Sequence, residues 1–148
     1  MTRKLCTRMG EFVRDPGDWL RRLSPDEWIR AGLGELRRAE ASFERGDARA
    51  GTAGVKRAAG MALNGVLLVE PKESWGRTYV DHVEALAAEQ SVPEAVRAAC
   101  RALLEAAGPS PGVVNLRTPR ADERKLEAAR DVIAHAWAVV KRHEQASG

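Results

Sequence analysis

The chain has 148 residues, of which 44% are hydrophobic and 30% charged, and its formal net charge is +3. This length and balance are typical of one globular domain with a hydrophobic core and exclude a wholly disordered chain. No apolar run reaches the roughly 20 residues that cross a bilayer, and no apolar signal segment follows the basic start. We therefore expect a cytoplasmic protein with no membrane contact.

Neither the cysteines nor the basic residues indicate a ligand by themselves. Cys6 and Cys100 lie far apart and outside any Cys-x-x-Cys spacing, which argues against a disulfide framework and a zinc site. Cys100 lies among apolar residues, so we expect a buried thiol. Acidic residues are interleaved with the basic ones, and a solvated surface explains the positive charge without nucleic acid. No cofactor or metal motif is present.

The chain divides into a short N-terminal segment and one helical domain. Residues 1–23 show little periodicity and contain the turn signal Asp15-Pro16-Gly17, so we expect an arm or a short helix there. The domain, residues 24–145, begins at Ser24-Pro25-Asp26-Glu27, which has the spacing of a capping box with proline at the first helical position. The helix that follows ends at Gly46 and is expected to bury Ile29, Leu33, Leu36 and Phe43.

Asp47 can cap a second helix, from about Ala48 to Val69, which forms an antiparallel hairpin with the first. Four glycines interrupt this helix, and each costs about 1 kcal/mol relative to alanine. We expect close approach of neighbouring helices to compensate for Gly51, Gly54, Gly60 and Gly65. A bound ligand is the alternative explanation.

Three further segments complete the predicted domain. A shorter helix is expected around Tyr79–Glu89, and the capping-box spacing of Ser91 and Glu94 opens another that ends at Gly108. Residues 108–118 form a loop, after which Thr118-Pro119 starts the last helix, reaching about Lys141. The sequence thus predicts an all-α fold, a four- to five-helix up-and-down bundle.

The last helix is more apolar than one bundle edge requires. One stripe is expected to face the core, and a second stripe widens it: Leu126, Ala129, Ile133, Trp137 and Val140, then Ala128, Val132, Ala136 and Val139. Homodimerisation through this helix is one explanation. Cover by the N-terminal arm is the other.

The same helix carries the strongest candidate for chemistry, Arg130, Asp131 and His135. Asp131 and His135 are four residues apart and share a helix face, so the carboxylate can orient the imidazole and raise its pKa. Arg130 lies roughly 140° around the helix from His135. Two copies facing each other would bring the arginine and the histidine together, with phosphate bound by arginine and histidine acting as general acid or base. The alternative is a surface pair in a charged helix.

Several segments resemble HEPN domains: WIRAGLGELRRAEASFERGD, AGVKRAAGMALNGVLL, DHVEAL and ERKLEAARDVIAHAWAVVKRH. The similarity covers roughly residues 25–143. It implies a helical bundle, usually a homodimer, and many HEPN proteins belong to toxin–antitoxin or defence systems beside a nucleotidyltransferase. Active members are metal-independent ribonucleases with an Arg-x4-6-His motif, and Arg130-Asp131-x3-His135 matches that form.

These observations predict a HEPN-like binding or interaction module, a homodimer in a bacterial-type cytoplasmic system. The alternative is a metal-independent endoribonuclease in which Arg130 binds phosphate, His135 transfers protons and Asp131 orients His135. Its expected partners are RNA and a nucleotidyltransferase or antitoxin. A helical adaptor unrelated to HEPN domains is a third hypothesis, since a fold does not determine a function.

Overall fold

The computed structural model describes residues 12–106 and 119–147, and these residues form helices and connections without a strand. They contain five α-helices: α1 (Pro25–Glu44), α2 (Ala48–Val69), α3 (Tyr79–Ala88), α4 (Glu94–Glu105) and α5 (Pro119–Ser147). Two 3-10 helices, Leu20–Arg22 and Glu73–Trp75, precede α1 and α3. The prediction of an all-α bundle is confirmed.

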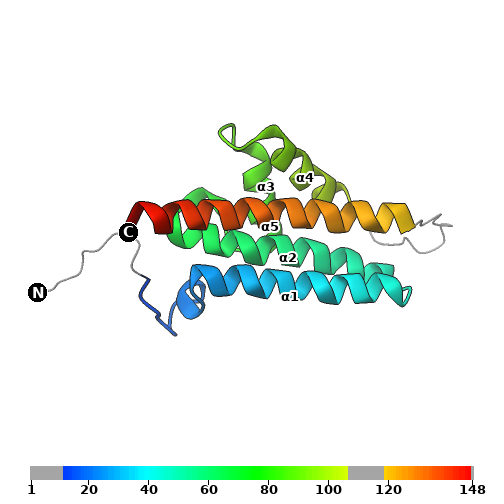
Figure 1. The fold of residues 1–148 in the computed structure, drawn as a ribbon, viewed down its shortest axis with the longest axis horizontal. Helices are drawn as coiled ribbons and strands as arrows, with labels where there is room; N and C mark the ends of the chain where they lie inside the picture. Colours follow the sequence, from blue (N-terminus) through cyan, green and yellow to red (C-terminus); the bar gives the residue numbers. More distant parts are fainter. Residues whose placement is uncertain (1–11, 107–118, 148) are drawn as a thin grey trace, which may run out of the picture.

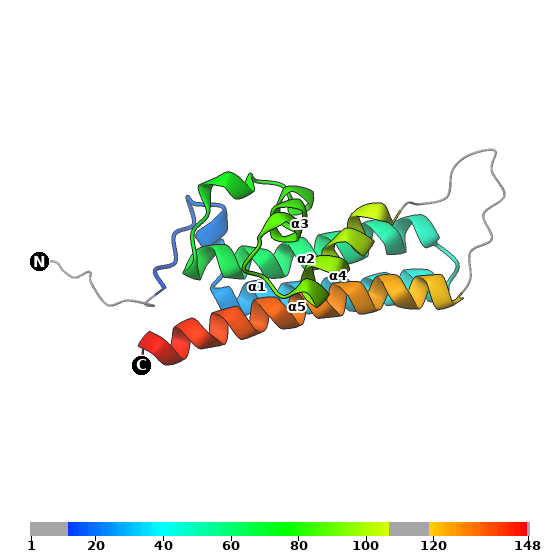
Figure 2. The same ribbon diagram turned by 90° about the horizontal axis from the view of Figure 1, so that it is seen from above.

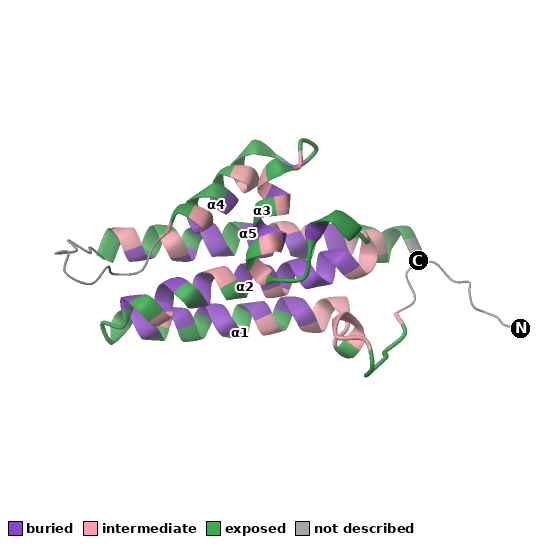
Figure 3. Cartoon of the chain, turned by 180° about the vertical axis from the view of Figure 1, so that it is seen from behind, coloured by how far each residue is buried: buried purple, intermediate pink, exposed green. Residues whose placement is uncertain are grey.

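Three long helices, α1, α2 and α5, lie side by side, and the shorter α3 and α4 pack across α2 and α5 (Figures 1 and 2). α1 and α2 are antiparallel, and α5 runs in the same direction as α2 (Figure 1). The helices bury their apolar faces against one another, and α2 is the most enclosed of them (Figure 3). Consequently only a narrow strip of α2 remains at the surface.

Local signals set the ends of the α1–α2 hairpin as the sequence predicts. The Ser24 hydroxyl accepts from the backbone N–H of Glu27, and the Glu27 carboxylate accepts from the backbone N–H of Ser24, which completes the capping box. At the other end Gly46 adopts a positive φ of 86°, a conformation that favours glycine. The Asp47 carboxylate then caps α2 by accepting from the N–H of Ala50.

Glycines allow α2 to approach its neighbours closely, as the sequence predicts. A Cβ at Gly65 would lie 2.8 Å from the Pro25 carbonyl oxygen, and one at Gly51 would overlap the Phe43 ring. A Cβ at Gly60 would overlap Tyr79, the first residue of α3. Each glycine therefore lowers helix propensity but lets a neighbouring helix pack directly against the backbone of α2.

The starts of the two short helices differ from the sequence prediction. The Ser91 capping box is wrong: α4 begins after Pro93 without a side-chain cap, and the Ser91 hydroxyl donates instead to the Glu89 carboxylate at 3.0 Å. A capping box does begin α3, between Thr78 and Asp81. Both motifs have the same spacing, but proline at the capping position cannot supply a side-chain acceptor.

The expectation that the second apolar stripe of α5 is left uncovered by the bundle is wrong. Ala128, Val132, Ala136 and Val139 are all buried in the core of the single chain. Helix α4 packs against α5 and helps to cover it. Neither a second copy nor the N-terminal arm is therefore needed to bury this stripe. Trp137, expected in the core, is 53% exposed, and Leu33 of α1, also expected inside, is 38% exposed. α5 also extends to Ser147, beyond the predicted end at Lys141.

Of the remaining predictions, some are confirmed and others concern residues outside the described part of the chain. Cys100 is fully buried as predicted, and burial raises the pKa of its thiol to about 12. Among the described residues before α1, Leu20–Arg22 form a short 3-10 helix, and a short helix was one of the two forms expected there. Cys6 and the predicted loop over residues 108–118 lie outside the described residues.

Candidate anion-binding groove

The predicted trio on α5 does not converge on one point. The Arg130 guanidinium is exposed and directed to the carboxylates of Glu123, at 3.2 Å, and Glu40 of α1, at 3.7 Å. Asp131 is exposed and His135 half-buried, and the structure gives no hydrogen bond between them. Within one chain, Arg130 therefore belongs to the α1–α5 surface and not to a site shared with His135.

His135 instead lines a crevice of about 80 Å³ between α5, the end of α2 and the α3–α4 connection. Arg142, two turns further along α5, lines the same crevice with Lys72 and Glu70. Burial lowers the pKa of His135, the Arg142 charge lowers it further, and Glu70 opposes them. The expectation that Asp131 raises this pKa is wrong, because burial and a cation dominate the surroundings of the ring.

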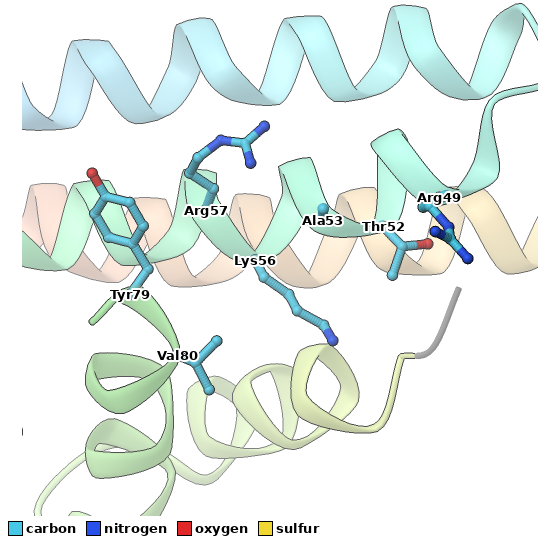
Figure 4. Close-up of a pocket in the computed structure, with 7 residues that line it drawn as sticks. All are labelled: Arg49, Thr52, Ala53, Lys56, Arg57, Tyr79 and Val80. Atoms are coloured by element: carbon cyan, nitrogen blue, oxygen red, sulfur yellow. The ribbon is translucent and has the colours of Figure 1, made fainter. Parts of the chain in front are cut away.

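A larger hollow, of about 510 Å³, lies along the exposed strip of α2 (Figure 4). α2 supplies Arg49, Thr52, Ala53, Lys56 and Arg57, and the start of α3 supplies Tyr79 and Val80. The α2 residues recur at intervals of three and four, so one helix face presents them all. We call this hollow the α2 groove.

Positive charge dominates the α2 groove. Within the described residues, neither Arg49 nor Lys56 forms an ion pair. Lys56 extends toward α4 and Arg57 points the opposite way, toward α1 (Figure 4). Beside them the Lys125 ammonium of α5 donates to the Thr52 hydroxyl at 3.0 Å. Several cations around one concave surface attract an anion more strongly than scattered surface charges do.

One buried carboxylate, Glu35 of α1, fixes Arg57 at the edge of the groove. Only 7% of Glu35 is exposed, and its two oxygens bind separate partners: Arg38 at 2.6 Å and the Nε of Arg57. Burial would raise the pKa of Glu35, but hydrogen bonds from both arginines outweigh it and hold the pKa below its ordinary value. The glutamate therefore stays charged and positions Arg57 through Nε, which leaves the terminal nitrogens of the guanidinium available to a ligand.

Tyr79 closes one end of the α2 groove with an aromatic ring and a hydroxyl. The ring is half-buried, and its hydroxyl points toward α1 on the same side as Arg57 (Figure 4). Burial raises the pKa of the phenol, with Glu35 adding to the effect and Arg57 opposing it. The hydroxyl therefore remains protonated and can donate a hydrogen bond to an anion.

Sequence reasoning missed the α2 groove because it weighed charges along the whole chain. Acidic residues are interleaved with basic ones overall, but the 22 residues of α2 contain Arg49, Lys56 and Arg57 and no acidic residue. That local imbalance, on a helix whose other face is apolar, was the available signal. Tyr79 and Val80 of α3 reach the groove only through the tertiary fold, so no pattern in the sequence indicated their contribution.

The comparisons with known proteins add no relative. No family model matches the chain, and searches of curated proteins and of solved structures return no match. Within the described residues, no group of three or more histidine, cysteine, aspartate and glutamate side chains is placed to hold a metal ion. No helix among these residues has both the length and the apolar composition for crossing a membrane. The fold and the groove thus define an all-α helical bundle with a cationic concave surface.

Proposed function

We propose that this protein is a HEPN-like helical binding module that holds a phosphorylated ligand in the α2 groove. The observation that carries the proposal is the placement of Arg49 and Lys56 around a hollow that Arg57 and Tyr79 also line. Among the residues that the structure describes, neither of these two cations has a carboxylate partner. Arginine binds phosphate oxygens through paired N–H donors and lysine binds them as a point charge. The hollow brings both side chains to one concave surface, where their charges act together on an anion.

Titration with inorganic pyrophosphate tests this function directly. Isothermal calorimetry at low salt should give saturable binding to the wild type and a loss of at least tenfold in affinity for the Arg49→Gln/Lys56→Gln variant. Arg30→Gln is the matched control, because this exposed arginine of α1 does not line the groove. Equal binding by all three proteins, or none by the wild type at millimolar concentration, would contradict the proposal.

The dimer remains part of the proposal, on a different surface from the one the sequence indicated. Trp137 leaves more than half of its surface exposed on α5, and the Lys141 ammonium lies over its ring at 5.9 Å. Exposed tryptophan is frequent among residues that dominate protein interfaces. Two chains associating here would bury Trp137 and bring Arg130, on the same side of α5, near a second copy.

A metal-independent ribonuclease is the second candidate function, and the His135 crevice favours it. A half-buried imidazole with a lowered pKa is neutral at physiological pH and so can act as a general base. Arg142 shares its crevice, whereas Arg130 would have to act from a second chain. Incubation of total RNA in EDTA with wild type, His135→Ala, Arg142→Ala and Arg130→Ala distinguishes these arrangements. Cleavage that persists in His135→Ala would exclude this histidine as the base.

A further inference from the structure

A second hollow lies beside the α2 groove, along the same stretch of α2. This neighbouring space, of about 310 Å³, lies over the contact between α1 and α2 and is lined by Arg38, Arg45 and Arg57, with Glu35 and Ser42 between them. Arg57 lines both hollows, and its guanidinium points from the first toward α1 (Figure 4). The two spaces therefore meet at one side chain, and we call them together the cationic track.

Five basic residues and one carboxylate line the cationic track: Arg38, Arg45, Arg49, Lys56 and Arg57, with Glu35. Glu35 is buried and binds two of the arginines, so the charged groups that remain accessible in the track are positive. The Arg45 guanidinium is held by a hydrogen bond to the Ser42 hydroxyl at 3.2 Å. That bond leaves most of the donors of Arg45 to a ligand.

We infer that the ligand of the cationic track is a single-stranded nucleic acid, whose successive phosphates occupy the two hollows on either side of Arg57. This inference rests on the proposed function, because it identifies the phosphorylated ligand. Arg49 and Lys56 are seven residues apart, or about 10 Å along α2, and Arg38 and Arg45 line the second hollow beside the same stretch of that helix. One phosphate group reaches only part of this surface, whereas a chain of phosphates covers it.

The lining of the track also suits a flexible strand more than a duplex. Small residues, Ala39, Ala50, Ala53 and Gly54, line its two parts and leave room for ribose and bases beside the cations. Tyr79 and the 43% exposed Val80 offer apolar surface at one end, where a base can stack. A rigid duplex presents its phosphates on a convex surface and would meet only the rim of the hollows.

Fluorescence anisotropy with labelled oligouridylates of increasing length tests this inference. Affinity should rise from the dinucleotide to about eight nucleotides, a length within the range of single-strand sites, and then level off. Five cations less one carboxylate give about four net charges, so log Kobs should fall against log salt with a slope of about −3. An RNA hairpin without single-stranded tails should bind more weakly than the unpaired strand.

Two variants separate this inference from the proposed function. Arg45→Gln removes a cation from the second hollow only, so it should make the salt slope for the octanucleotide shallower by about 0.7 and leave pyrophosphate binding unchanged. Lys56→Gln, in the first hollow, should weaken both ligands, and Arg30→Gln neither. Pyrophosphate binding with no gain from length, no effect of Arg45→Gln, or equal binding of the hairpin would overturn the inference alone. Failure of every ligand would remove both.

Discussion

Because α1 and α2 cross closely, alanine substitution is expected to have opposite effects on stability at two glycines of α1. A Cβ at Gly32 would lie 2.7 Å from the Ala58 carbonyl oxygen, which belongs to the backbone of α2 and cannot rotate away. A Cβ at Gly34 would have only two arginine nitrogens within 4 Å, both at 3.9 Å. The two glycines therefore share a helical backbone conformation but differ in the room available for a methyl group.

The Gly34→Ala variant should gain about 1 kcal/mol of unfolding free energy from helix propensity alone. The Gly32→Ala variant gains the same amount but incurs an overpacking cost of about 1–3 kcal/mol, and displacement of backbone places it toward the upper limit. We therefore expect Gly32→Ala to be about 1–2 kcal/mol less stable than the wild type. The two variants should then differ by about 2–3 kcal/mol.

Urea denaturation followed by circular dichroism at 222 nm measures this difference, provided that the transition is two-state. In a thermal melt, each kcal/mol corresponds to about 2–4 °C for a chain of roughly this size. Equal stabilities for the two alanine variants would refute the close approach of α1 to α2 at Gly32. A stabilised Gly32→Ala would do the same.

Three further predictions concern single side chains. Burial lowers the pKa of His82 below 6.5, so the unfolded chain binds more protons and stability should fall as the pH drops below about 6.5; urea titrations from pH 7.5 to 5 should show a smaller fall in His82→Leu, and an equal fall would exclude His82 as a source. Cys100, fully buried and with a raised pKa, should react with iodoacetamide only after unfolding, as mass spectrometry of the Cys6→Ser variant can show; labelling of the folded protein would contradict its burial. Trp137→Ser should convert a dimer to a folded monomer by light scattering, whereas Val132→Glu, at a fully buried position, should unfold the chain; an unchanged mass in Trp137→Ser would remove this surface from the interface.

Local sequence signals predicted most of the fold, because they depend on neighbours in the chain. The capping box at Ser24, the stop at Gly46 and the cap at Asp47 each involve residues within one helical turn. The failures came from tertiary packing. Trp137 follows the apolar spacing of α5 but is exposed, whereas the second stripe is buried in a helix against which α4 packs. No periodicity in α5 itself contains that information.

The sequence also did not indicate which charged side chains pair with one another across helices, and Glu35 is an example. As a glutamate two residues before Arg37 and three before Arg38, it fits a solvated helix face, yet it is buried and binds Arg57 from the next helix. The sequence could show that an acid and an arginine were present but not that they meet across a hairpin. The predicted rise in the pKa of His135 failed in the same way, since burial and the Arg142 charge lower that pKa.

The glycines and the cationic track have a common physical origin. α2 can be enclosed by α1, α3 and α5 because glycine and alanine occupy its contact faces. Its three cations must then emerge through the remaining surface strip, where Arg49, Lys56 and Arg57 gather without any acidic residue of the same helix. Arg38 of α1 and Arg45, directly after its end, add two cations from the other side of the hairpin, and α1 directs Glu35 inward, where it binds Arg57. Tight packing of the central helix thus gathers five of the chain's basic residues around one surface.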